Sequence, residues 1–228
     1  MVNYEDETYH RKRHPELLQD DELRLAWSCF SDLAYFQHVM PGDSILEFGG
    51  GLGNNLLSVC KRAKTWMVEP SHIGRDLVRN KGITVASSLS ETSNQQFDTV
   101  LCRHVLEHVD HPLATLRELL QVLKPNGKLI LVLPCENMKD FPSETDIDHH
   151  LYCWSARTIG NLMEKAGYKV DRIHFEYFGA KRKLLPIYRL MGGEAYAHAV
   201  RLVGRIFSFK ELVVEARNVS VSVCRSTL

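Results

Sequence analysis

The segment that most constrains the fold is a short run of glycines that follows an apolar stretch. Residues 45–48 read ILEF, and residues 49–54 read GGGLGN. Glycine lacks a Cβ, so it adopts positive φ and lets a ligand approach the backbone closely. The free N–H groups that open a helix attract polar or anionic ligand groups. The segment therefore predicts a strand, a tight turn at a ligand site and a helix that runs through Leu56, Leu57, Val59 and Cys60, although an ordinary structural turn is the alternative.

The spacing of the glycines separates two classes of ligand. Nicotinamide-binding turns follow the pattern G-x-G-x-x-G, whereas Gly49, Gly51 and Gly53 alternate directly and Asn54 comes next. This spacing argues against a nicotinamide-dependent oxidoreductase.

Two acidic residues near the glycines favour an adenosyl ligand with a cationic amino-acid group. The second apolar stretch, residues 65–68, ends in Glu69, about twenty residues after the first glycine, where a carboxylate can accept both ribose hydroxyls. Glu47 comes directly before the glycines, where a carboxylate can face an ammonium group. With a pyrophosphate cofactor, the carboxylate of Glu47 would instead lie beside negative charge, which is unfavourable.

Two further motifs follow in order. Residues 97–102 read FDTVLC and continue as RHVLEHV, and residues 119–129 read LLQVLKPNGKL. From about residue 40 to 170 the chain resembles the class I S-adenosylmethionine-dependent methyltransferases. The glycine turn is similar to their motif I, and the other two segments are similar to their "LEHV" and "LKPGG" motifs, with Asn126 in place of the first glycine of the latter.

The alternation of strands and helices predicts an α/β fold whose ligands lie at the carboxyl ends of the strands. The resemblance implies a Rossmann-like three-layer sandwich: a mostly parallel seven-stranded sheet with an antiparallel last strand and helices on both faces. It also implies an enzyme with S-adenosyl-L-methionine as cofactor. The chain has Ser88 and Leu89 where many relatives place an Asp for the adenine. The predicted cofactor-binding residues are Glu47, Gly49, Gly50, Gly51, Gly53, Asn54, Glu69, Pro70, Ser88, Leu89, Cys102 and Arg103.

The sequence predicts that the chain divides into two parts, residues 1–40 and residues 41–228. Residues 1–40 comprise a charged arm, up to residue 15, and an amphipathic helix that covers the cofactor cleft or simply packs on the core. Residues 41–228 form the methyltransferase domain, with a helix capped by Ser155 and stopped by Gly167. A basic amphipathic insertion at about 178–210 is either a solvated insertion or a contact with a homodimer partner or an anionic surface.

Composition limits the partners. Equal numbers of acidic and basic residues, 28 each, and the lack of a nucleic-acid motif favour a small-molecule or glycan-type acceptor, methylated on oxygen or nitrogen, over RNA or DNA. No apolar run is long enough to span a membrane. The six cysteines are scattered without a C-x-x-C pair, which predicts a cytoplasmic protein without a zinc cluster or a disulfide framework.

Histidines are the predicted proton acceptors, because an imidazole is largely unprotonated near neutral pH. The candidates are His104, His108, His149 and His150. The last two end a polar segment from residue 134 that predicts a loop over the site. No metal is predicted there, since its carboxylates show no helical pairing or EF-hand spacing. The alternatives are catalysis by positioning alone and a non-catalytic protein that binds an adenosyl ligand.

Overall fold

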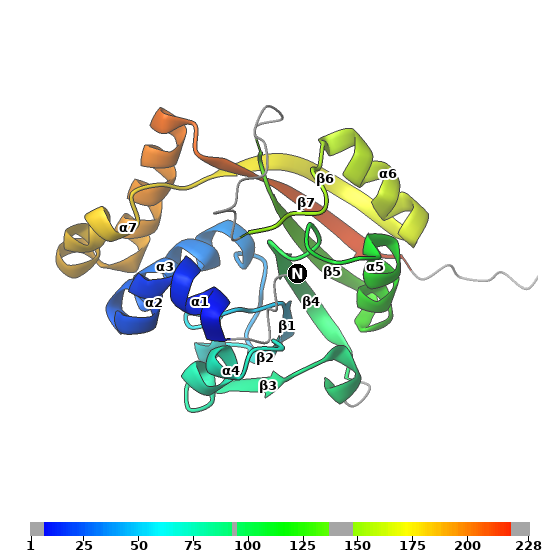
Figure 1. Ribbon diagram of the computed structural model, residues 1–228, viewed down its shortest axis with the longest axis horizontal. Coiled ribbons are helices and arrows are strands. Elements are labelled where there is room, and N and C mark those ends of the chain that lie inside the picture. Colours follow the sequence, from blue (N-terminus) through cyan, green and yellow to red (C-terminus); the bar gives the residue numbers. More distant parts are fainter. Residues whose placement is uncertain (1–6, 93–94, 137–147, 220–228) are drawn as a thin grey trace, which may run out of the picture.

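The computed structural model describes residues 7–92, 95–136 and 148–219. Within these residues one seven-stranded sheet has the order β3-β2-β1-β4-β5-β7-β6 (Figure 1). The strands are β1 (Ser44–Phe48), β2 (Lys64–Val68), β3 (Ile83–Ala86), β4 (Phe97–Arg103), β5 (Leu123–Pro134), β6 (Tyr168–Tyr177) and β7 (Lys210–Asn218). Strand β7 is antiparallel to both β5 and β6, whereas the other pairs are parallel. The predicted fold, including the antiparallel last strand, is confirmed.

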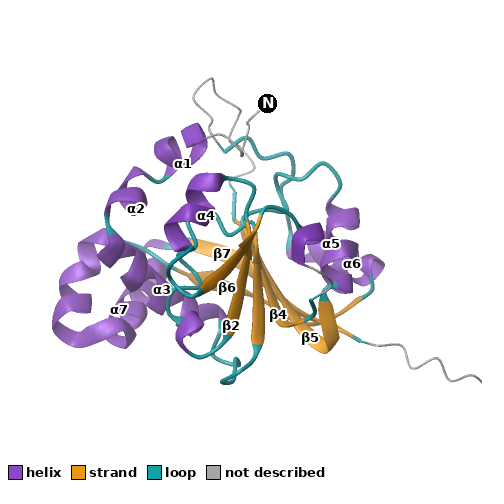
Figure 2. Ribbon diagram, turned by 90° about the horizontal axis from the view of Figure 1, so that it is seen from below, coloured by secondary structure: helices purple, strands orange, loops and turns teal. Residues whose placement is uncertain are grey.

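Helices cover both faces of the sheet. They are α1 (Glu7–Arg13), α2 (Pro15–Gln19), α3 (Asp21–Tyr35), α4 (His72–Val78), α5 (Pro112–Gln121), α6 (Ala156–Ala166) and α7 (Leu185–Phe207). Figure 2 shows α5 and α6 on one face and α3 and α7 on the other. Residues 99–102 of β4 and 129–133 of β5 are all buried, as expected for mostly apolar strand segments with both faces of the sheet covered. The carboxyl ends of β1, β2 and β4 therefore meet at one edge.

Helix α6 begins and ends where its sequence signals predict. The Ser155 side chain accepts a hydrogen bond from the Thr158 N–H at 3.1 Å, and Thr158 bonds back to the Ser155 backbone. Gly167 adopts φ +104° and ends the helix. A reciprocal cap and a left-handed glycine are the standard solutions for unpaired backbone groups at the two helix ends.

Two local predictions are wrong. The helix expected after the glycines is replaced by turns and a short 3-10 helix, η1 (Val59–Lys61). Glycine and asparagine are poor helix formers, and the Asn55 side chain is bound to other elements. At the other end, residues 7–13 of the expected arm form α1, while residues 1–6 lie outside the described residues.

The stretch at 178–210 forms η3 (Arg182–Leu184) and α7. Helix α7 packs against α3 through Tyr196, Ala197 and Val200, all fully buried, while several apolar side chains on its other side are exposed. A homodimer contact or an anionic surface contact through this stretch stays a prediction. None of the helices in the described part of the chain combines the length and hydrophobicity needed to cross a bilayer.

Candidate cofactor and acceptor site

The glycine turn is held in an unusual backbone conformation directly after β1. Gly49, Gly51 and Gly53 have φ angles of +71°, +54° and +71°. These are left-handed values that side chains other than glycine rarely adopt. The turn is fixed to β2, because the N–H groups of Gly49 and Gly50 both donate to the Val68 carbonyl, at 2.8 and 3.2 Å. The alternate spacing of the glycines thus follows from the conformation of the turn.

The surroundings of the glycines show which side of the turn is open. A Cβ on Gly49 would lie 2.2 Å from a Val105 side-chain atom, and one on Gly50 would lie 2.3 Å from Met67. A Cβ on Gly51 would meet only His10, at 3.7 Å. A Cβ on Gly53 would likewise lie 2.3 Å from Val78, so packing of the protein itself explains Gly49, Gly50 and Gly53. Only Gly51 faces a side from which a ligand could approach.

Glu69 lies beside this open position, at the end of β2. Its carboxylate accepts hydrogen bonds from the Gly51 N–H at 2.7 Å and from the Ser71 N–H at 2.9 Å. The His10 ring of α1 covers it, with Nε2 at 3.6 Å from a carboxylate oxygen, and both side chains are buried. Two backbone amides therefore orient the carboxylate, and the lone pairs that remain can accept hydroxyl groups.

Glu47 is the second carboxylate of this edge. It is 1% exposed, and its Oε1 accepts from the Asn55 side chain at 2.5 Å. Its Oε2 has no hydrogen-bond partner among the described residues. Burial raises the pKa of Glu47 to about 8, against the lowering effects of Asn55 and Arg103. A cationic donor at this oxygen would offset the cost of burying the charge.

Side chains of helix α3 form hydrogen bonds with the glycine turn and with Asn55 after it. The buried Arg24 donates to the Asn54 side chain at 3.1 Å and to the Leu52 carbonyl at 2.8 Å. The indole of Trp27 donates to Asn55 at 3.3 Å. Asn54 is thus used to bind α3, and its predicted cofactor contact stays a prediction.

A charged cluster forms where β4 ends. Glu211, the second residue of β7, is 0% exposed and is contacted by the Tyr35 hydroxyl, by Arg103 at 2.8 Å and by Nε2 of His104 at 3.0 Å. Burial alone would raise the pKa of Glu211, but Arg103 and His104 lower it to about 2. Burial and Arg103 lower the pKa of His104. His104 also has φ +54°, a left-handed backbone conformation that is unfavourable for residues other than glycine.

Lys181 completes the cluster from the far end of β6. Its Nζ lies 3.4 Å from the centroid of the Trp27 ring. Burial and the nearby Arg103 lower the pKa of Lys181 to about 7. It lines a cavity of about 470 Å³ with residues that include Glu16, Phe178 and Phe209. Lys181, with its lowered pKa, therefore lines the cavity beside Trp27.

The other predicted site residues have varied places. Ser88 and Leu89 follow β3, where the Ser88 hydroxyl contacts that of Ser90 at 2.8 Å. Pro70 is exposed, and Cys102 lies wholly within the core, so its thiol packs among apolar side chains. Of the remaining histidines, His108 follows β4, whereas His149 and His150 end the predicted loop, of which residues 137–147 fall outside the described residues. His108 and His150 approach each other, and His149 is exposed.

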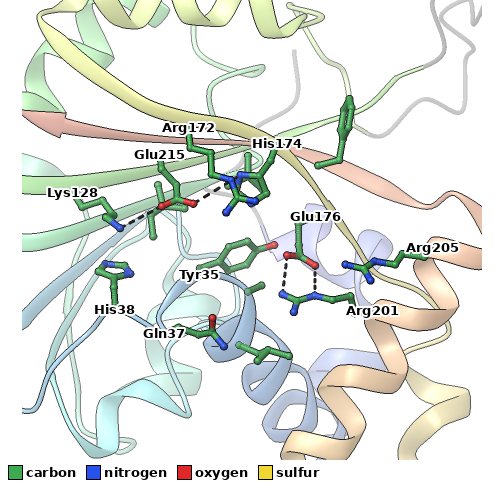
Figure 3. Close-up of a pocket in the computed structure, with 15 residues that line it drawn as sticks. Tyr35, Gln37, His38, Lys128, Arg172, His174, Glu176, Arg201, Arg205 and Glu215 are labelled. Carbon is green, nitrogen blue, oxygen red and sulfur yellow. Dashed lines mark hydrogen bonds and ion pairs between the residues drawn. The ribbon is translucent and has the colours of Figure 1, made fainter.

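A second cavity, of about 400 Å³, lies on the face of the sheet between α3 and α7. In Figure 3, Arg201 pairs with Glu176, and Glu215 lies between Lys128 and His174. None of the predicted site residues lines this cavity. It is therefore separate from the strand edge that carries the glycine turn.

Sequence reasoning missed four residues of the site, which are His10, Arg24, Lys181 and Glu211. Arg24 stands on the predicted covering helix, and a buried arginine there breaks its apolar pattern. Glu211 lies one residue before the stretch that the sequence predicts as the last strand, residues 212–221, so its place beside the end of the fourth strand could be inferred only from the strand order. His10 and Lys181 carry no sequence signal, since each reaches the site from a loop or helix distant in the chain.

A sheet of this order, with a glycine turn after β1 and an acid after β2, defines a class I methyltransferase fold. Residues 9–173 match the methyltransferase domain family. The chain therefore belongs to the class I S-adenosylmethionine-dependent methyltransferase family, a family of enzymes, and the nicotinamide alternative is wrong.

Curated relatives match part of the chain. The ubiquinone/menaquinone biosynthesis C-methyltransferase UbiE of Cupriavidus metallidurans is 28% identical over 108 residues, which is 42% of this chain and 44% of that protein. UbiE of Paraburkholderia phymatum is 28% identical over 128 residues, 50% of this chain and 52% of that protein. The chain thus spans about half the length of the curated relatives it matches.

Solved structures agree with the fold. A SAM-dependent methyltransferase from Thermotoga maritima has a TM-score of 0.61 at 18% identity, covering 92% of this chain and 98% of that one. The 1,6-didemethyltoxoflavin-N1-methyltransferase of Burkholderia thailandensis, solved with S-adenosylhomocysteine, has a TM-score of 0.60 at 14% identity, covering 93% and 84%. At these identities the likeness concerns the fold alone.

Proposed function

We propose that this protein moves a methyl group from S-adenosylmethionine to an oxygen or nitrogen atom of a small molecule. The observation that carries this proposal is the pair of basic groups, His104 and Lys181, beside the carboxyl end of β4. Oxygen and nitrogen acceptors shed a proton as they attack, so a base with a pKa near neutrality suits them. A glycan-type acceptor is included, because its hydroxyl groups also lose a proton when they are methylated.

The cofactor contacts in this proposal follow from the residues of the edge. Glu69 accepts the ribose hydroxyls and Glu47 faces the ammonium group, whose charge suits its buried free oxygen. The Gly51 backbone lines the ligand, and Ser88 and Leu89 lie towards the adenine. When bound, S-adenosylmethionine supplies a methyl group already activated by its positive sulfur. The protein then has to align the acceptor about 3 Å from that carbon.

The proposed proton acceptors act differently. The contact of His104 Nε2 with Glu211 fixes one tautomer, which leaves Nδ1 as the nitrogen that can take a proton. Lys181 is next to the cavity that would hold the acceptor, and its neutral amine can take a proton directly. His108, His149 and His150 remain weaker candidates for this role, because His104 is nearer to the strand end.

The test is a search for the methylated product. Purified protein is incubated with metabolite fractions and S-adenosylmethionine carrying a carbon-13 methyl group, and the chemical shift of the transferred methyl tells oxygen, nitrogen and carbon acceptors apart. We expect Lys181→Met or His104→Asn to lower turnover by ~10²–10⁴-fold with nearly unchanged cofactor affinity. Lys183→Met, an exposed neighbour, is the control. Full turnover in both site variants would contradict the base assignment.

Methylation of carbon is the second candidate. It is favoured by the similarity to UbiE, a C-methyltransferase by name. A carbon-bound label in the product would select this candidate over the first. Tight binding of S-adenosylhomocysteine without turnover on any fraction would instead favour the non-catalytic adenosyl-binding alternative.

A further inference from the structure

Three potential metal ligands gather beside the acceptor side of the cleft. Glu107 and His108 follow β4, and His150 precedes α6. One ligand atom from each lies within 4.8 Å of the other two. Nε2 of His108 is 3.9 Å from a Glu107 oxygen, and the rings of His108 and His150 have centroids 4.7 Å apart. A backbone hydrogen bond of 2.8 Å, from the Leu151 N–H to the Glu107 carbonyl, holds the two segments together.

Glu107 is the member of the cluster that most needs a partner. It is 0% exposed, and neither of its carboxylate oxygens has a hydrogen bond within the described ranges. An ionised carboxylate buried without hydrogen bonds is strongly disfavoured, and native proteins pair such groups or use them to coordinate metals. The two imidazoles face the same space, so a cation there would contact all three side chains.

We propose that Glu107, His108 and His150 bind one divalent transition-metal ion, of the kind represented by Zn²⁺, Fe²⁺ or Co²⁺. Two imidazoles and one carboxylate form a ligand set that these ions favour over Mg²⁺ or Ca²⁺, which prefer oxygen ligands. Ligands of a tetrahedral ion at ~2.1 Å lie roughly 3.4 Å apart, so the observed separations of up to 4.8 Å have to contract by up to about 1.4 Å. Small side-chain rotations at the half-buried histidines can supply that change.

The carboxylate of Glu136 contacts Nδ1 of His150. A carboxylate behind a metal-binding histidine orients the ring and strengthens the ligand, and this pattern accompanies most such sites. Three protein ligands leave coordination positions open. An oxygen atom of the acceptor could bind there, which would lower its pKa and place it for methyl transfer; this last step rests on the proposed function.

The sequence predicts that the carboxylates spread along residues 136–150 do not bind a metal ion. The proposed ligands come instead from the "LEHV" motif and from one histidine at the end of that loop. The sheet brings them together, because the residues after β4 and those before α6 meet above the same strand ends. The spacing of these three residues along the chain does not predict that they lie close together.

The test is a Co²⁺ titration of chelator-treated full-length protein, followed by visible absorption and by competition with Zn²⁺. We expect one ion per chain, with absorption bands of a cobalt site that has nitrogen ligands. His150→Ala and Glu107→Gln should each weaken binding by more than about tenfold, since loss of even an outer contact costs 10–100-fold. His198→Ala, an exposed histidine on α7, should bind like the parent.

Circular dichroism and binding of S-adenosylhomocysteine, measured on the same samples, report whether each variant is folded. If Glu107→Gln does not fold, His108→Ala takes its place. A folded parent that binds no stoichiometric ion, or folded variants that bind as tightly as the parent, would overturn the proposal. Because the titration needs neither donor nor acceptor, its result is independent of whether the proposed methyl transfer is correct.

Discussion

Replacement of Glu211 by glutamine tests the electrostatics of the charged cluster. This carboxylate is 0% exposed, and its pKa falls from 4.5 to about 2 because Arg103 and His104 outweigh the opposing effect of burial. At ~1.4 kcal/mol for each tenfold change in acidity, the interaction stabilises the folded protein by about 3 kcal/mol at neutral pH. Glu211→Gln also leaves Arg103 buried without its counter-ion, which puts the expected loss at about 3–5 kcal/mol.

The pH dependence of this loss gives a sharper test. Because the folded pKa is lowered, the stabilisation by Glu211 is complete above pH 4.5 and disappears as the pH falls towards 2. The parent should therefore lose stability on acidification through this group, whereas the glutamine variant cannot. Between neutral pH and about pH 4 the gap between the two proteins should narrow by about 1 kcal/mol.

Urea unfolding followed by far-ultraviolet circular dichroism measures both quantities. Glu194→Gln, an exposed glutamate on α7, is the control and should change stability by less than about 0.5 kcal/mol. The reasoning fails if Glu211→Gln costs less than about 1 kcal/mol at neutral pH with an unchanged m-value. It also fails if the gap stays constant on acidification.

Three further predictions concern the cofactor. Glu69→Ala should weaken S-adenosylmethionine binding by about tenfold or more, because charge-assisted hydrogen bonds are worth ~1.5–3 kcal/mol each; an unchanged Kd by calorimetry would remove Glu69 from the ribose. Gly51→Val should abolish binding of S-adenosylhomocysteine, since φ there is +54° and the side chain would point towards His10; parent-like binding would make the turn purely structural. In the parent, affinity should rise as the pH approaches 8, the pKa to which burial raises Glu47, because an ammonium group favours the charged carboxylate. Glu47→Gln should flatten that rise, and a calorimetric pH series in which both proteins behave alike would contradict it.

Local sequence signals predict the alternation of strands and helices and the strand-turn unit of the candidate site, whereas the seven strands and the antiparallel last strand are predicted from the family resemblance. The positive φ of Gly51 and the place of Glu69 follow from spacing within one strand-turn unit, and the ends of α6 follow from Ser155 and Gly167. The contact between Glu211 and His104 does not, because it depends on β7 pairing with β5, with Glu211 opposite Pro134. Packing between distant segments is decided by the whole sheet, so no spacing rule along the chain reports it.

The buried carboxylates of the strand edge explain why a cationic ligand suits it. Glu47, Glu69, Glu107 and Glu211 are each at most 5% exposed. Glu69 is bound by backbone amides, and Glu211 is balanced by Arg103. Glu47 keeps one buried oxygen without a hydrogen bond and Glu107 keeps two, so in the described part of the chain these two acids gain most from a cation. In the proposals above, Glu47 pairs with the ammonium group of the donor and Glu107 coordinates a metal ion. A pyrophosphate cofactor would instead add negative charge beside the same acids, which is the electrostatic reason this edge selects a sulfonium donor.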